Sequence, residues 1–313
     1  MTRQKWVWAS QILLGLAVGW FVWRALARQW SEFLHLDWSM IAPRPGLLAG
    51  SACIVFTTYA LLIAAWRSIL LGWGERFSFR TAIHVWAVSN LGRYLPGKLW
   101  SVAGLAVLSR RAGVSGLASI GAAVAMQAVA VGTAAAVAAT MVPAVLNLWQ
   151  LGIALLLAFG VISLLANPRA LAALRRINNG TGTLRSLPVH VAVVSSIVMT
   201  LSWVGYGVAF WLLAHGLLTD VDLTLRLAIG VFAVGYVVGL LALFAPGGIG
   251  VREAVYVAML TPAMGSGAAL ALAAGSRLLL TTTELAAAVV GAVLRESDDQ
   301  MTIAALREDD GHE

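Results

Sequence analysis

Apolar stretches long enough to cross a lipid bilayer recur along almost all of the 313 residues, and they constrain the fold more than any other feature. Of all residues, 60% are hydrophobic and only 11% are charged, whereas about a quarter of a typical soluble domain is charged. Stretches of this kind cross a membrane as helices. The composition therefore predicts an all-α polytopic membrane protein that forms a single membrane domain over residues 1–313.

Six of the stretches are long enough to be complete spans, since a spanning helix needs about 20 apolar residues. They lie at about 6–27, 47–66, 114–142, 148–166, 188–214 and 268–294. Two further stretches are interrupted by proline and glycine, at Leu95-Pro96-Gly97-Lys98 and at Ala245-Pro246-Gly247-Gly248. The apolar segments after these breaks correspond to only about 16 and 21 Å of helix. Neither is expected to cross a hydrocarbon core of about 30 Å alone.

The basic residues indicate the orientation, because lysine and arginine accumulate on the cytoplasmic side of a membrane. The loops expected inside carry Arg67, Arg76, Arg80, Arg110, Arg111, Arg169, Arg175, Arg176 and Arg185. With the amino terminus also inside, residues 79–109 must leave and return to the inside face, and residues 224–262 to the outside face. Both stretches are therefore predicted to be re-entrant hairpins that enter from opposite faces. Both termini, including a short tail at 295–313, are expected to be cytoplasmic.

The order of span, span, hairpin and span occurs twice, at about 6–142 and at about 148–294. Each unit contains three spans, an odd number, so the second copy is inverted relative to the first. The predicted fold is an inverted repeat of six full spans plus two re-entrant helical hairpins, which makes eight hydrophobic segments. Paired interruptions at corresponding positions of such repeats point to a binding site near the midplane.

Three segments carry a resemblance to a known family. They are Ser89-Asn90-Leu91-Gly92-Arg93-Tyr94-Leu95-Pro96-Gly97-Lys98-Leu99-Trp100, Arg110-Arg111-Ala112-Gly113-Val114-Ser115 and Ala245-Pro246-Gly247-Gly248-Ile249-Gly250-Val251-Arg252-Glu253. Together they resemble the flippase-like transmembrane family, which includes the membrane half of lysylphosphatidylglycerol synthases and many stand-alone members. The resemblance implies a protein that moves, or helps to move, a lipid with a polar headgroup across the cytoplasmic membrane.

Two departures from the family pattern matter. The lysyl-transferring soluble domain of the synthases is missing from these residues, which argues against synthase activity. Gln127 stands where many relatives have an acidic residue, which argues against a charged group in the span at 114–142.

The chemistry around the breaks favours an anionic guest. A helix that begins just after a Pro-Gly tip presents unpaired N–H groups and the positive end of its dipole, and nearby lysine or arginine adds full charge. In the last span, Arg277 and Glu284 share a face about 10 Å apart along the axis, and ionisable groups inside a membrane are functional candidates. The predicted substrate-binding residues are Arg93, Pro96, Gly97, Lys98, Pro246, Gly247, Gly248, Gly250, Arg252, Glu253, Arg277 and Glu284.

Structural roles stay open for several of these residues. Glu253 and Arg277 can form a structural ion pair. The glycines of the second break can serve turn geometry and tight packing as well as the close approach of a phosphate. Outside this set, His84 is either a proton carrier or a hydrogen-bonded helix residue.

The sequence argues against several other functions. Gly92 to Lys98 has the glycine and lysine spacing of a P-loop, but Leu99 occupies the Ser/Thr position that would meet magnesium. The acidic and histidine residues do not converge as a catalytic centre requires, and Cys53 is the single cysteine. The protein is therefore not expected to be an enzyme, to hold a metal or cofactor, or to bind nucleic acid.

The sequence thus predicts a lipid flippase or scramblase of the cytoplasmic (inner) membrane, with an anionic phospholipid or a polyprenyl-phosphate-linked lipid as its partner. One alternative is a non-catalytic accessory subunit of a lipid-modifying or polysaccharide-export enzyme, such as a glycosyltransferase. The patterns Gly15-x-x-x-Gly19 and Gly235-x-x-x-Gly239 would pack against that partner or against neighbouring helices. A second alternative is a secondary transporter of a small soluble anion. No oligomeric state is predicted.

Overall fold

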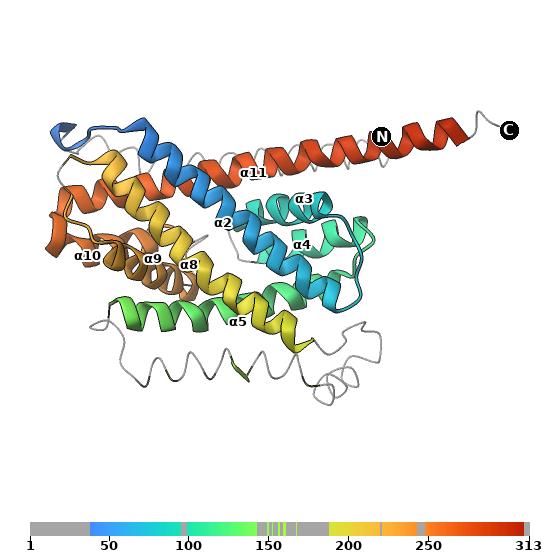
Figure 1. The fold of residues 1–313 in the computed structure, drawn as a ribbon, viewed down its shortest axis with the longest axis horizontal. Coiled ribbons are helices and arrows are strands. Elements are labelled where there is room, and N and C mark those ends of the chain that lie inside the picture. The colour runs from blue at the N-terminus through green and yellow to red at the C-terminus, as the bar shows by residue number, and fades with distance from the viewer. Residues whose placement is uncertain are drawn as a thin grey trace, which may run out of the picture.

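The computed structural model describes residues 38–94, 99–142, 188–219, 221–242 and 248–309, with isolated positions between 149 and 167. In this part of the chain every named element is a helix, and the short 3-10 helices are marked η (Figure 1). The elements are η1 (Trp38–Met40), α2 (Pro45–Gly72), α3 (Phe79–Asn90), η2 (Leu91–Tyr94), α4 (Leu99–Arg111), α5 (Gly116–Met141), α8 (Val189–Leu217), α9 (Leu225–Leu241), α10 (Val251–Met264) and α11 (Ser266–Asp309).

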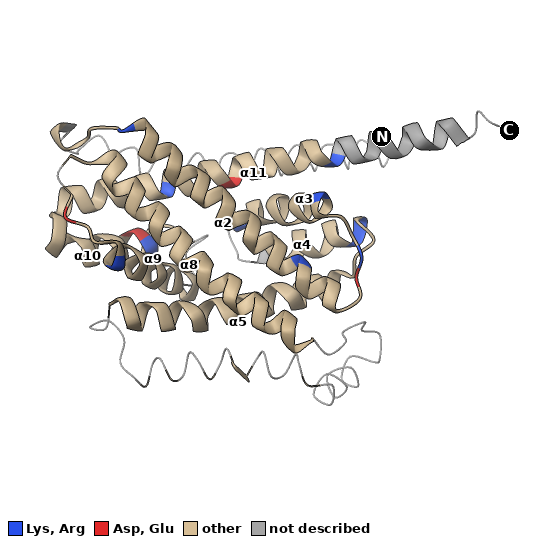
Figure 2. Ribbon diagram, in the orientation of Figure 1, with Lys and Arg blue, Asp and Glu red and all other residues tan. Residues whose placement is uncertain are grey.

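Four of the described helices are long and apolar enough to cross a membrane: α2, α5, α8 and the part of α11 from Ser266 to Arg295. Charged residues are sparse along them (Figure 2). They confirm as helices the spans predicted at 47–66, 114–142, 188–214 and 268–294. The protein is therefore a multi-pass helical membrane protein. The predicted spans at 6–27 and 148–166 lie outside the described residues, apart from isolated positions in the second.

Small polar residues between the apolar runs set where several helices begin. The Ser78 hydroxyl accepts a hydrogen bond from the Thr81 N–H at 3.0 Å, and Ser115 and Thr224 cap α5 and α9 in the same way. Such caps satisfy an N–H group that has no partner within its helix. The last helix, in contrast, has no residue that would stop it just after Leu294. No proline or glycine follows Leu294 until Gly311, and α11 continues without a break through Asp309 instead of ending where the short tail was expected.

The first hairpin differs from the prediction in how its first arm ends. The α-helix stops at Asn90 and the chain tightens into η2, whereas a continuous segment up to Leu95 was expected. The tighter turn brings Gly92 against α4, where a Cβ atom would lie 2.6 Å from the Ser101 nitrogen. Only glycine permits this approach, so η2 is pressed directly onto the backbone of the second arm.

The second hairpin consists of α9 and α10, which pack against each other. A Cβ atom at Gly235 would lie 2.3 Å from the Tyr256 ring, and one at Gly239 would lie 3.3 Å from Arg252. The Gly235-x-x-x-Gly239 pattern therefore packs against α10 of the same chain. Helix α10 continues through Pro262 to Met264, two residues beyond the expected end, and stops at Gly265 with a φ of 80°.

The two hairpins begin and end at opposite ends of the bundle. The Ser115 N–H, just after α4, donates to Glu75, just before α3, at 3.3 Å, so both ends of the first hairpin meet where α2 ends. At the other end, Thr219 precedes α9 and donates to the Met40 carbonyl at 3.0 Å, while Gly267 follows α10 and lies against Met40. That end is where α2 begins, and α2 with its 28 residues is roughly 40 Å long.

Each hairpin packs on a long helix from the other half of the chain. Helices α3 and α11 pack together, and so do α9 and α5, while α4 packs on α5 and α10 on α11 (Figure 1). Helices α2 and α8 pack most extensively of all, and the Ser51 hydroxyl donates to the Ala209 carbonyl between them at 2.6 Å. If α2, α3, α4 and α5 are exchanged with α8, α9, α10 and α11, in that order, the same set of neighbouring pairs results.

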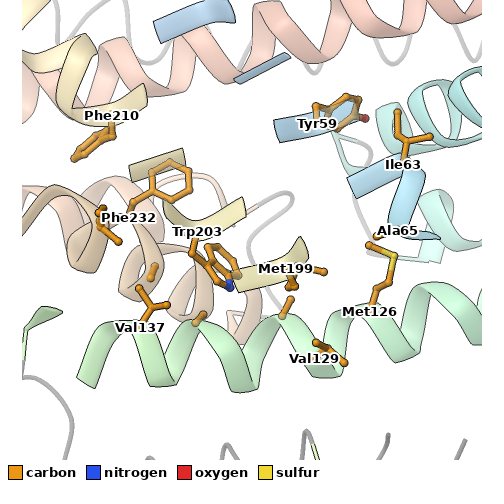
Figure 3. Close-up of a cluster of buried hydrophobic side chains, with 14 of the residues drawn as sticks. Tyr59, Ile63, Ala65, Met126, Val129, Val137, Met199, Trp203, Phe210 and Phe232 are labelled. Carbon is orange, nitrogen blue, oxygen red and sulfur yellow. The ribbon is translucent and has the colours of Figure 1, made fainter. Parts of the chain in front are cut away.

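The apolar core fills the space between these helices. Met199 of α8 lies near Met126 and Val129 of α5, and Trp203 lies near Val137 (Figure 3). The buried His84 joins α3 to α11, with its Nδ1 3.2 Å from the Gly291 carbonyl and its Nε2 3.2 Å from the Arg295 guanidinium. It is therefore a hydrogen-bonded helix residue.

The close approach of η2 to α4 gives a first prediction. Gly92→Ala should destabilise the protein by about 1–3 kcal/mol, because the added methyl group meets backbone atoms that cannot move aside. The unfolding temperature of the purified protein in detergent should fall by several degrees. Gly46→Ala is the matched control, since nothing lies within 4 Å of its added Cβ. Equal unfolding temperatures for the two variants would contradict the packing.

Candidate functional site

The first hairpin contributes a charged residue that reaches the last long helix. In η2, Arg93 donates from Nη1 to Glu284 Oε1 of α11 at 2.7 Å, and from Nη2 to Asn90 Oδ1 at 2.8 Å. The Tyr94 hydroxyl donates to the second carboxylate oxygen of Glu284 at 2.8 Å. Both oxygens of Glu284 therefore have a partner on the first hairpin, although the two residues of the ion pair are 191 positions apart.

The second hairpin reaches the same helix through a weaker ion pair. Glu253 Oε1 lies 3.9 Å from Arg277 Nη1, beyond hydrogen-bond distance, and its Oε2 accepts from the Gly250 N–H at 2.6 Å. This second contact satisfies an N–H group at the start of α10. The ion pair between Glu253 and Arg277 considered from the sequence is thus present, and Glu253 also caps its own helix. The Arg277 guanidinium stands 5.7 Å from the centre of the Tyr94 ring.

Arg252 is held differently, by aromatic side chains. Its Nε donates to the Tyr256 hydroxyl at 2.6 Å, and its guanidinium carbon lies 4.6 Å from the centre of the Phe232 ring and 5.5 Å from that of Tyr256. Such cation–π contacts favour a desolvated cation. Its Nη2 is buried without a hydrogen-bond acceptor among the described residues. Within the described part of the chain, Arg252 therefore keeps an unused donor.

A cavity of about 300 Å³ lies between the hairpins and the long helices. Arg93, Arg252 and Glu284 are the charged residues among those that line it in the described part of the chain. Its other polar and aromatic lining residues are Tyr59, Trp86, Ser89, Asn90, Ser101, Gln127, Ser202, Trp203, Tyr206, Phe232 and Tyr236. Two neutral pairs lie in its wall: Asn90 donates to the Tyr59 hydroxyl at 3.2 Å, and Gln127 donates to the Tyr236 hydroxyl at 3.2 Å.

The remaining candidate residues have other positions. Glu253 and Arg277 do not line the cavity and instead connect α10 to α11. Gly248 and Gly250 adopt φ values of 72° and 85°, which only glycine tolerates readily, so both serve the geometry of the turn before α10. Pro96, Gly97, Lys98, Pro246 and Gly247 lie outside the described residues.

Sequence reasoning missed the neutral part of the cavity wall. Tyr59, Gln127 and Tyr236 sit within apolar helices, and the sequence marks them only as polar groups where hydrocarbon is expected. Gln127 was noted as the departure from the family pattern. In the structure its position lines the cavity, and the amide holds a tyrosine of the second hairpin.

The sequence profile of the family described as the lysylphosphatidylglycerol synthase TM region matches residues 8–287. The chain belongs to this family. The match includes Arg93, Arg252 and Glu284, the charged residues described in the cavity wall. A comparison with curated proteins finds no match.

Membership of the lysylphosphatidylglycerol synthase TM-region family confirms the resemblance seen around the two breaks. The family description refers to the membrane part of a synthase that makes a modified phospholipid, and not to its catalytic domain. Membership therefore relates this chain to lipid handling in a membrane, and the cavity lies within the matched residues.

The pair between Arg93 and Glu284 gives a second prediction. Glu284→Gln and Arg93→Gln should each destabilise the protein by about 1–3 kcal/mol, because each leaves a partly buried partner unsatisfied. The double variant should lose less than the sum, by a coupling energy of about 0.5–3 kcal/mol. Unfolding of the four proteins in detergent measures this cycle, with the exposed Arg111→Gln as a control for loss of one positive charge. Additive losses would show that the pair does not stabilise the fold.

Proposed function

We propose that this protein is a flippase or scramblase that moves a lipid with an anionic headgroup across the cytoplasmic membrane. One observation carries the proposal: the same cavity is lined by charged and hydrogen-bonding residues and by apolar residues, two of which, Val102 and Val124, are exposed at the surface of the helix bundle and form its apolar rim. An amphiphile has the same division between headgroup and tail.

The charged residues of the wall provide the headgroup chemistry. Arg93 and Arg252 bring positive charge to the cavity from the two hairpins, and the start of α10 adds the positive end of a helix dipole beside Arg252. In surroundings of low dielectric constant these charges act more strongly than in water. Arg252 lines the cavity, and its buried Nη2 has no acceptor among the described residues, so a small shift of the side chain would bring this donor to an anion in the cavity.

The rim provides the apolar chemistry. Val102 of α4 and Val124 of α5 line the cavity, yet their side chains are 38% and 58% exposed. Leu105, Ile120 and Ala123 line the same wall. The wall between α4 and α5 thus joins the cavity to the apolar outer surface of the bundle, and a hydrocarbon chain can leave there while its headgroup stays inside. A small soluble anion has no apolar part that would contact such a rim.

The arrangement of the hairpins supports transport between the two faces of the membrane. In the proposed architecture, α3 with α4 and α9 with α10 are re-entrant hairpins of an inverted repeat. The opposite positions of their open ends and the exchangeable packing of the two halves support this architecture. In transporters built this way, the substrate binds between the repeats and each half can open to one face.

The accessory-subunit alternative receives less support from the structure. Gly235 and Gly239 pack on Tyr256 and Arg252 of the same chain, so this pattern is occupied internally. Gly15-x-x-x-Gly19 lies outside the described residues.

Reconstitution tests the proposal. In vesicles that contain fluorescent phosphatidylglycerol, the protein should expose the inner-leaflet lipid to an impermeant quencher faster than empty vesicles do. Arg252→Gln should slow this by about tenfold or more, because a hydrogen bond to a charged group contributes about 1.5–3 kcal/mol. Arg111→Gln, on the exposed end of α4, should keep the full rate.

A wild-type rate equal to that of empty vesicles, for phosphatidylglycerol and for a polyprenyl-phosphate lipid alike, would overturn the proposal. Circular dichroism and gel filtration of Arg252→Gln separate a loss of transport from a loss of folded protein. Unchanged transport by folded Arg252→Gln would remove Arg252 from the substrate site.

A further inference from the structure

The charges of the cavity wall restrict the amount of charge on the headgroup as well as its sign. Arg93 and Glu284 are 2.7 Å apart and compensate each other, so Arg252 leaves a net charge of one positive unit among the described lining residues. Glu253 does not alter this balance, because it turns away from the cavity toward Gly250 and Arg277. A single negative charge is therefore matched by the described lining residues, and a second one would have no counterpart among them.

The described part of the cavity wall also offers no good partner for a cationic substituent. Glu284 is its acidic residue in the described part, and its two oxygens already accept hydrogen bonds from Arg93 and Tyr94. An ammonium group on the headgroup would have to displace one of these donors. Zwitterionic headgroups are disfavoured for this reason, as an unpaired charge in such surroundings is costly.

Neutral polar groups line another part of the wall, beside its apolar residues. Tyr59, Asn90, Gln127 and Tyr236 combine donors and acceptors with two aromatic faces, and their mutual hydrogen bonds of 3.2 Å can exchange with hydroxyl groups. A volume of about 300 Å³ lies at the small end of ligand pockets. It suits one glycerol or one sugar unit and not an oligosaccharide.

We propose that the cavity selects a phosphodiester with one negative charge and a small, neutral, hydroxyl-bearing substituent, and that Arg252 recognises its phosphate. The proposal rests on the lipid-transport function and names the substrate class of the same site. Either a diacylglycerol or a polyprenyl chain could carry this headgroup, because the selecting groups contact only its polar part.

Binding of short-chain lipids to the purified protein in detergent tests the selection. Dihexanoyl phosphatidylglycerol should bind at least about tenfold more tightly than dihexanoyl phosphatidic acid, a phosphomonoester, and dihexanoyl phosphatidylcholine, a zwitterion. Geranyl phosphoglucose tests the polyprenyl source, and glycerophosphoglycerol, which has no tails, tests a free soluble phosphodiester. Tighter binding of both lipids than of glycerophosphoglycerol supports an amphiphilic substrate, and equal binding of all three would contradict it.

Changing the charge of the wall tests the mechanism of selection. Glu284→Gln raises the net charge by one and should reduce the preference for phosphatidylglycerol over phosphatidic acid by about tenfold. Gln127→Glu removes the net positive charge and should weaken phosphatidylglycerol binding by a similar factor. This second variant tests the same mechanism if Glu284→Gln does not fold. The exposed Arg111→Gln should change neither value.

The outcomes separate this inference from the transport function. Equal affinity for the three dihexanoyl lipids, together with transport of phosphatidylglycerol in vesicles, would overturn the charge selection and leave the transport function standing. Selective binding without transport would support the charge selection and overturn the transport function.

Discussion

The carboxylate of Glu284 accepts hydrogen bonds from Arg93 and Tyr94 inside a bundle of apolar helices, and the rest of the site depends on this contact. An ionised group at such a depth costs several kcal/mol unless it is paired and hydrogen-bonded. The pairing fixes the end of the first arm of the first hairpin to α11. Two turns earlier on the same helix, Arg277 faces Glu253 at the start of α10. One helix thus places both hairpins, and the cavity is the space left between them.

Interrupted helices explain why such a space can exist within apolar surroundings. A continuous helix satisfies its own backbone and presents only side chains to its neighbours. In the proposed architecture the two hairpins instead turn back within the bundle, where the N–H groups at the start of a helix need partners, and the Gly250 N–H finds one in Glu253. Gly92 and Gly235 let the arms of each hairpin approach closely. Close packing within each hairpin and open space between the hairpins are therefore two consequences of the same chain breaks.

Much of this arrangement follows from local sequence, and the remainder depends on contacts that local sequence does not record. The apolar runs give the helices α2, α5, α8 and α11, since length and composition decide a span. Arg93, Arg252 and Glu284 could be selected individually because a charge inside an apolar run is conspicuous. The sequence could not show that Arg93 pairs with Glu284, because 191 residues separate them. Arg277, on the same helix, was an equally plausible partner for Glu284. The end of α3 at Asn90 was also missed, since the 3-10 turn that follows it goes with a close approach of Gly92 to α4 that local sequence does not record.

The exchangeable packing of the two halves contrasts with an unequal distribution of charge. Helix α11 meets the hairpins through Glu284 and Arg277, whereas α5, its counterpart in the packing, meets Tyr236 of α9 through the neutral Gln127. Separating Arg93 from Glu284 would leave two ionised groups without partners in an environment of low dielectric constant. Separating Gln127 from Tyr236 leaves neutral groups, at a cost of about 1–3 kcal/mol each at most, and hydroxyl groups of the proposed headgroup substrate would replace the lost contact. The contact between α5 and α9 is therefore the easier one to open, and it borders the cavity on the side where α4 and α5 carry the apolar rim.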